Sequence, residues 1–141
     1  MKTFLASLVV LLACAAAPAQ DKTITIWPKG VPPGGIKQRA DFGDHVIFIS
    51  HRDKSGRVEV HENKADVMVI QSGSATFVAG GRVIDPVKTA PDEIQGSSLH
   101  GGVGRTVSAG DVIEVPVGLP HQFLLAPGEQ ITYLVVKVVK H

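Results

Sequence analysis

The sequence predicts an all-β domain, a sandwich or barrel of short strands. The 141-residue chain divides into short runs that alternate in polarity or are rich in β-branched residues. Fifteen glycines and nine prolines separate these runs instead of clustering as low complexity. No convincing amphipathic helix of about ten residues or more follows the N-terminal segment. Many short strands divided by turn residues are typical of a sandwich or barrel.

The N-terminal segment predicts export. "MKTFLASLVVLLACAAAPAQ" places a basic residue before an apolar run and ends in small residues, the order of a secretory signal peptide, and the run is too short to span a membrane. "APA" favours cleavage before Gln20, with a signal peptide at 1–19 and one domain at 20–141. "LLAC" leaves a lipoprotein open, with a lipid anchor on Cys14. Either route predicts a periplasmic or extracellular location.

Composition excludes several classes of protein. Cys14 is the only cysteine, so the exported domain has no internal disulfide and must be held together by its core. About 120 residues suffice for one such core. The net charge is +1, from 14 basic and 13 acidic residues without a basic block, which argues against a nucleic-acid partner.

Runs that alternate in polarity and runs of β-branched residues predict the positions of the strands. "DKSG" indicates a turn and predicts a hairpin of 45–52 with 57–63, in which a four-residue loop would place Arg52 opposite Arg57, and a Gly80-Gly81 turn predicts a second hairpin. The segment 85–104 has no clear period and is expected to be an irregular loop. Short strands return from residue 105 onward. The strands expected before the loop are 23–28, 45–52, 57–63, 66–73 and 74–84.

The second half carries a specific motif. "GDVIEVPVGLPHQFLL" contains Gly110, Pro116, Gly118 and His121 at the spacing G-x5-P-x-G-x2-H. This resembles the second motif of the cupin superfamily. His121 also begins an apolar strand, so its side chain is expected to point into the barrel.

A degenerate form of the first cupin motif lies upstream. Gly56, His61 and Gly73 follow the pattern G-x5-H-x-H-x3,4-E-x6-G, with the first spacer one residue short. Asn63 stands where the pattern has a second histidine, and Asp66 stands for its glutamate, one residue early. The two motifs run from Gly56 to Leu125, a little more than half of the exported domain, and resemble those of small single-domain bacterial cupins.

The resemblance implies a cupin jelly roll, also called a double-stranded β-helix barrel, with a divalent metal inside it. Carried over residue by residue, the metal ligands are His61, Asp66 and His121. Two imidazoles and a carboxylate suit iron, and equally manganese, zinc or nickel. Asn63 is a weaker ligand or a substrate contact, and Glu59 shares the strand face of His61 and is another candidate contact.

Plainer roles for these residues stay open. His121 is alternatively a core histidine satisfied by a backbone carbonyl or water, and Asp66 a turn residue that caps backbone N–H groups. Asn63 alternatively lies in the turn, and Glu59 is solvated or paired with a nearby arginine or lysine. The loop length between the two strands of the first hairpin decides whether His45 and His51 face the site. His100 is expected to be exposed.

Two classes of function follow. The first is a metalloenzyme of isomerase, lyase or dioxygenase type that acts on a small polar molecule. The alternative is a non-catalytic module of the cell envelope that binds or senses a small molecule; a structural, storage-like cupin is a third possibility. A homodimer is expected, with the strand at 23–28 as the edge that pairs or exchanges.

Overall fold

The computed structural model describes residues 24–140. The expected signal peptide, both cleavage sites and Cys14 lie outside this part of the chain. Within the described residues, no helix combines the length and hydrophobicity that a membrane span requires.

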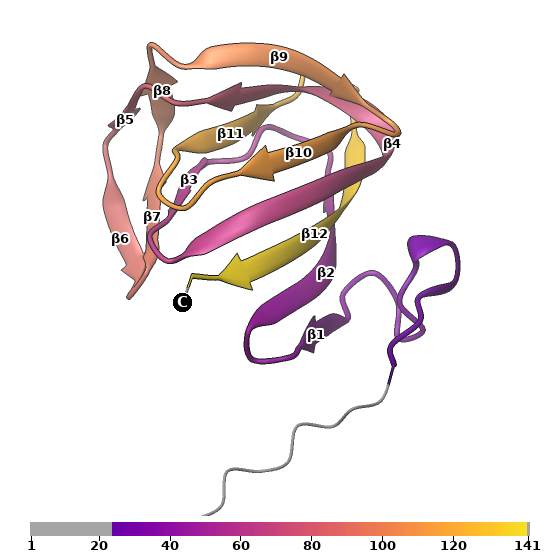
Figure 1. Ribbon diagram of the computed structural model, residues 1–141. Coiled ribbons are helices and arrows are strands. Elements are labelled where there is room, and N and C mark those ends of the chain that lie inside the picture. Colours follow the sequence, from indigo (N-terminus) through magenta and orange to yellow (C-terminus); the bar gives the residue numbers. More distant parts are fainter. Residues whose placement is uncertain (1–23, 141) are drawn as a thin grey trace, which may run out of the picture.

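Twelve strands and one short 3-10 helix make up the described chain (Figure 1). Ten of the strands form one strongly curled sheet in the order β1-β2-β12-β4-β11-β3-β7-β6, with β9 and β10 also paired to β4, while β5 and β8 form a separate pair. The elements are η1 (Pro28–Gly30), β1 (Arg39–Asp41), β2 (His45–Arg52), β3 (Val58–His61), β4 (Lys64–Ala79), β5 (Arg82–Ile84), β6 (Val87–Ala90), β7 (Glu93–Gly96), β8 (Ser98–His100), β9 (Val103–Ser108), β10 (Val112–Val115), β11 (His121–Leu124) and β12 (Ile131–Val139).

Strand β4 connects the two faces of the barrel. Its first half pairs with β12 and β10, and its second half pairs with β11 and β9. The buried positions change phase along the strand, from Asp66, Met68 and Ile70 to Ala75 and Phe77. A register shift in the pairing with β12 supplies the extra residue, as a β-bulge does.

Gly73 allows this corner. Its φ is +77°, and a Cβ there would lie 1.8 Å from the carbonyl oxygen of Gln130. Only glycine tolerates both constraints.

The core lies between the two faces, and aromatic rings follow one another through it, from Phe77 to Phe123 to Tyr133.

Both predicted hairpins are wrong. Strand β2 pairs with β1 and β12, whereas β3 pairs with β7 and β11, so Arg52 does not lie opposite Arg57. Strand β5 pairs with β8 instead of folding back on β4. The short-range turn signals therefore marked where strands end but not which strands pair, because the jelly roll pairs β2, β3 and β5 with strands farther along the sequence.

Two further expectations need correction. Residues 24–27 form no strand in the described chain, and Ile24 is 85% and Ile26 67% exposed. The segment 85–104 is not an irregular loop, because β6, β7 and β8 lie within it. Its strands are short and their outer faces are exposed, so they lack the hydrophobic alternation by which longer strands are recognised.

Candidate metal centre

A cavity of about 310 Å³ opens inside the curled sheet. Its walls come from both faces of the barrel and from β6 and β7, so residues far apart in sequence meet in it. The charged side chains and histidines that line it are Arg39, Arg52, Arg57, Glu59, His61, Lys64, Asp66, Glu93, His121 and Lys137.

Strand β3 supplies two inward side chains, Glu59 and His61, because they are two residues apart on one strand. Glu93 lies opposite His61 on β7 and its carboxylate forms a hydrogen bond with the imidazole Nδ1. The Nδ1–H donates to this carboxylate, so Nε2 faces the cavity. His61 is 6% exposed.

His121 enters from the second motif. A turn at Gly118, whose φ is +79°, precedes β11. The N–H of Gly118 donates to the carbonyl of His61, and this hydrogen bond connects the two motifs. The Nδ1 of His121 lies 3.1 Å from the carbonyl oxygen of Leu119 and donates to it. Its Nε2 is therefore also left for the cavity. A backbone carbonyl holding Nδ1 is a common arrangement for metal-binding histidines.

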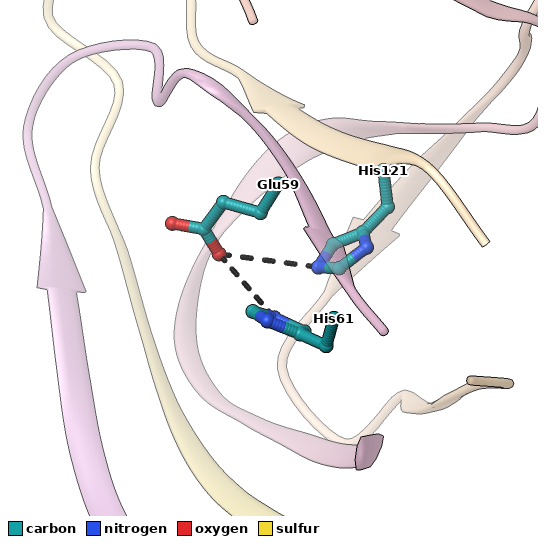
Figure 2. A group of neighbouring side chains, drawn as sticks. All are labelled: Glu59, His61 and His121. Carbon is teal, nitrogen blue, oxygen red and sulfur yellow. Dashed lines mark ion pairs between the residues drawn. The ribbon is translucent and has the colours of Figure 1, made fainter. Parts of the chain in front are cut away.

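Three ligand atoms converge in the cavity (Figure 2). Glu59 Oε2 lies 3.9 Å from His61 Nε2 and 3.9 Å from His121 Nε2, and all three atoms lie within 4.8 Å of one another. Arg52 Nη2 donates to the other oxygen of Glu59 at 3.3 Å and so orients the carboxylate. Ligand bonds of about 2.1 Å place donor atoms roughly 3.0–3.4 Å apart, so each 3.9 Å separation from Glu59 would have to close by about half an ångström, and the two imidazole nitrogens would have to come to a similar distance, for the set to hold an ion. The residues therefore fit a divalent metal.

Asp66 reaches the same place from β4. Its Oδ2 lies 3.2 Å from His61 Nε2 and 3.9 Å from His121 Nε2. Both its oxygens also accept hydrogen bonds from the ammonium of Lys137, at 2.8 and 2.9 Å. The three predicted ligands thus lie close together and are buried, but Asp66 already forms an ion pair with Lys137.

The local charges shift the pKa of each group. Burial and the charge of Lys137 lower the pKa of His61, but the hydrogen bond and charge of Asp66 and the charge of Glu93 outweigh them, so the pKa is raised. Burial would raise the pKa of Asp66, but His61 and Lys137 lower it. For His121, burial dominates and lowers the pKa. His61 Nε2 needs a free lone pair to accept from the Lys137 ammonium, so the ring is neutral while that hydrogen bond is made.

The other candidates lie elsewhere. Asn63 is in the link between β3 and β4 and does not line the cavity; its backbone oxygen accepts from the N–H of Lys140. His45 bonds to Asp44, His51 bonds to Thr132 on the outer surface, and neither lines the cavity. His100 is exposed, as expected.

Sequence reasoning missed two residues. Glu93 lay in the segment expected to be a loop, so nothing placed it beside His61. Lys137 carried a usable signal: it is the one charged residue of "ITYLVVKVV" and shares the inward phase of Tyr133 and Val135. A charge at an inward position of an apolar strand calls for a buried partner.

No protein-family model and no curated protein matches the sequence, but solved structures do. A conserved Klebsiella pneumoniae protein with a double-stranded β-helix domain gives a TM-score of 0.54 at 17% identity, over 84% of this chain and 90% of that one. Hydroquinone 1,2-dioxygenase from a Sphingomonas species, with 4-hydroxybenzoate bound, gives a TM-score of 0.51 at 12% identity, over 70% of this chain and 62% of that one. The chain has the cupin fold.

The all-β, jelly-roll prediction is therefore confirmed. The chain spans about half the length of peruvianin-I, a cysteine peptidase from Thevetia peruviana latex that it also matches, with a TM-score of 0.47 and 11% identity over 70% of this chain and 52% of that one. At these identities the solved structures establish the fold and leave the activity to be argued from the cavity.

Proposed function

We propose that this chain is an exported cupin that binds one divalent metal ion inside its barrel. The observation that carries the proposal is the convergence of His61 Nε2, His121 Nε2 and Glu59 Oε2 within 4.8 Å. Both imidazoles present Nε2 because their Nδ1 atoms are already bonded. Glu59 takes the place of Asp66 as the carboxylate ligand, because Lys137 engages both oxygens of Asp66.

The two imidazoles and a carboxylate are a ligand set for iron, manganese, zinc or nickel. A bound ion would supply a Lewis acid, which suits an isomerase, lyase or dioxygenase reaction. The chain's own residues would hold a small molecule that enters the cavity: Arg52, Tyr133 and Gln122 all line it, and Arg52 donates to the hydroxyl of Tyr133.

The charges at the cavity mouth favour a small anionic ligand. Arg39 and Arg57 line the cavity and are exposed, and within the described chain neither has a carboxylate partner. Arg39 lies over the ring of Phe48, 5.1 Å from its centroid. The deeper cations Arg52 and Lys137 have carboxylate partners. A carboxylate-bearing molecule would therefore find its counter-charge at the mouth.

Metal content tests the central proposal. Purified protein, reconstituted with Mn²⁺, Fe²⁺, Zn²⁺ or Ni²⁺ and desalted, should carry about one ion per chain by mass spectrometry. His61→Ala and His121→Ala should each abolish binding, and Glu59→Gln should weaken it. His51→Ala, which changes an outward histidine, is the matched control. Absence of metal from the wild type, or equal content in the cavity and control variants, would overturn the proposal.

The anionic-ligand part has a separate test. Thermal shift with malonate and benzoate, each compared with its neutral amide, should show stabilisation by the acids alone. Arg57→Gln should reduce that stabilisation, whereas Arg105→Gln on β9, outside the cavity, should not. Equal shifts with acids and amides would remove the argument from charge.

A second candidate function is a non-catalytic binding or sensing module of the cell envelope. The contacts of Lys137 favour it, because the ammonium satisfies His61 and Asp66 without any ion. Carboxylate binding that persists unchanged after EDTA treatment, with no turnover of any acid tested, would support this reading. Binding that requires added metal would exclude a metal-free module, and turnover of a bound acid would exclude a non-catalytic one.

A further inference from the structure

Lys137 is directed into the cavity by its strand. On β12, Tyr133 and Val135 are buried, and Lys137 follows in the same phase. The pairing of β12 with β4 places Lys137 directly opposite Asp66. Its side chain is 12% exposed, so the ammonium depends on protein partners and not on bulk water.

The ammonium finds three acceptors. Nζ lies 2.7 Å from His61 Nε2, and 2.8 and 2.9 Å from the two oxygens of Asp66. An ammonium has three N–H donors, so these contacts satisfy it completely. Asp66, at 3% exposure, has its charge balanced by the same contacts.

The same atoms would serve a metal ion. A ring nitrogen has a single lone pair, so His61 Nε2 cannot accept from Lys137 and ligate an ion at once. The charges of a divalent ion and an ammonium at adjacent positions also repel. Occupation of the site by metal therefore requires that Lys137 leave His61.

We propose that Lys137 is an internal competitor for the metal. Without metal, its ammonium balances the ligand set and keeps the cavity folded; a binding ion displaces it and frees Asp66 as a further carboxylate ligand beside Glu59. This inference rests on the proposed metal function and adds a regulation to it: the affinity of the site is set by the strength of the Lys137 contacts.

Metal affinity tests the competition. Lys137→Met keeps the length of the side chain without its charge, and exposed Lys140→Met is the matched control. Titration with Co²⁺, followed by its visible absorption bands, should give a Kd at least about tenfold lower for Lys137→Met than for the wild type, and an unchanged Kd for Lys140→Met. An equal or weaker affinity in Lys137→Met would overturn the inference.

A second pair of variants covers a failure to fold. Lys137→Met leaves Asp66 buried without a cation, so the comparison is repeated as Asp66→Asn against Asp66→Asn/Lys137→Met. The double variant should bind Co²⁺ more tightly than the single one. Equal affinities would again reject the competition.

Labelling supplies a readout on the wild type. Acetylation of Lys137 by an amine-reactive reagent, followed by mass spectrometry, should be slow without metal and faster with saturating Co²⁺, while Lys140 reacts at one rate throughout. Constant protection of Lys137 in metal-bound protein would contradict displacement. If neither the wild type nor Lys137→Met binds metal, the proposed function fails; if both bind equally, only the competition fails.

Discussion

The two sides of the cavity use the same types of residue but are balanced differently. On one side, His121 Nε2 and Glu59 Oε2 face each other at 3.9 Å, and Arg52 holds Glu59 from behind. On the other side, His61 and Asp66 are bridged by the Lys137 ammonium at 2.7 to 2.9 Å. Each carboxylate thus has a cation beside it, but Arg52 contacts only Oε1 of Glu59 and leaves Oε2 free, whereas Lys137 engages both oxygens of Asp66 and Nε2 of His61.

The difference teaches that donor type alone does not define a metal site. A histidine–carboxylate pair is available to an ion only where its ligand lone pairs are not already engaged by a donor. The number of buried cations beside the ligands matters as much as the number of ligands, and the two sides of this cavity separate these factors within one molecule.

The largest expected effect contrasts the two carboxylates. Asp66→Ala leaves the ammonium of Lys137 without its carboxylate and should lower the free energy of unfolding by about 3–5 kcal/mol. Glu59→Ala should cost about 1 kcal/mol or less, because Glu59 is partly exposed and Arg52 keeps Tyr133 as a partner. Urea unfolding of metal-free protein measures both. Equal losses of unfolding free energy in Asp66→Ala and Glu59→Ala would mean that the two carboxylates contribute equally to the charge balance of the cavity.

A smaller effect concerns the support of His61. Glu93→Gln weakens the acceptor of the Nδ1–H, so the ring is less firmly oriented and Nε2 is a poorer ligand. The affinity for Co²⁺ should fall about 10- to 100-fold. Glu62→Gln, which changes a solvent-facing glutamate paired with Lys88, is the control. An unaltered affinity in Glu93→Gln would place the metal on the His121 side alone.

The smallest effect is a pair of opposite pH dependences. The pKa of His121 is lowered, chiefly by burial, so the unfolded chain takes up a proton below about 6.5 before the folded chain does; stability is lost as the pH falls through the folded pKa. The pKa of His61 is raised, because its carboxylates outweigh burial, so stability is complete below about 6.5 and is lost as the pH rises through the folded pKa.

Unfolding of metal-free variants as a function of pH separates the two histidines. His121→Gln should flatten the stability profile below pH 6.5, and His61→Gln should flatten it above that value. Each substitution changes the slope of the unfolding free energy against pH. Changes of the same sign for both substitutions would show that the two histidines share one electrostatic environment.

The second motif could be located from sequence because its physics is local. Gly118 must turn the chain with a positive φ, and His121 must start an apolar strand, and both requirements are written in neighbouring residues. The same holds for Gly73, although its role as the corner between the two faces was not visible. His61 and Asp66 were found through the resemblance to the first cupin motif, by their spacing to Gly56 and Gly73.

Glu93 and Lys137 could not be placed in the same way. Glu93 meets His61 only because β3 pairs with β7, and Lys137 meets Asp66 only because β12 pairs with β4. Both hairpin predictions failed for the same reason, since local turn chemistry does not say which strand lies alongside which.

The sequence by itself determined the all-β class and the inward direction of His121, because periodicity and turn residues act over a few neighbouring positions, and the resemblance to the cupin motifs singled out His61. Only the tertiary structure decided the charge balance of the cavity. Strand pairing over long sequence separations brings Lys137 to Asp66 and Glu59 between the two imidazoles, and a pairing energy spread over whole strands leaves no signature in any short stretch of the chain.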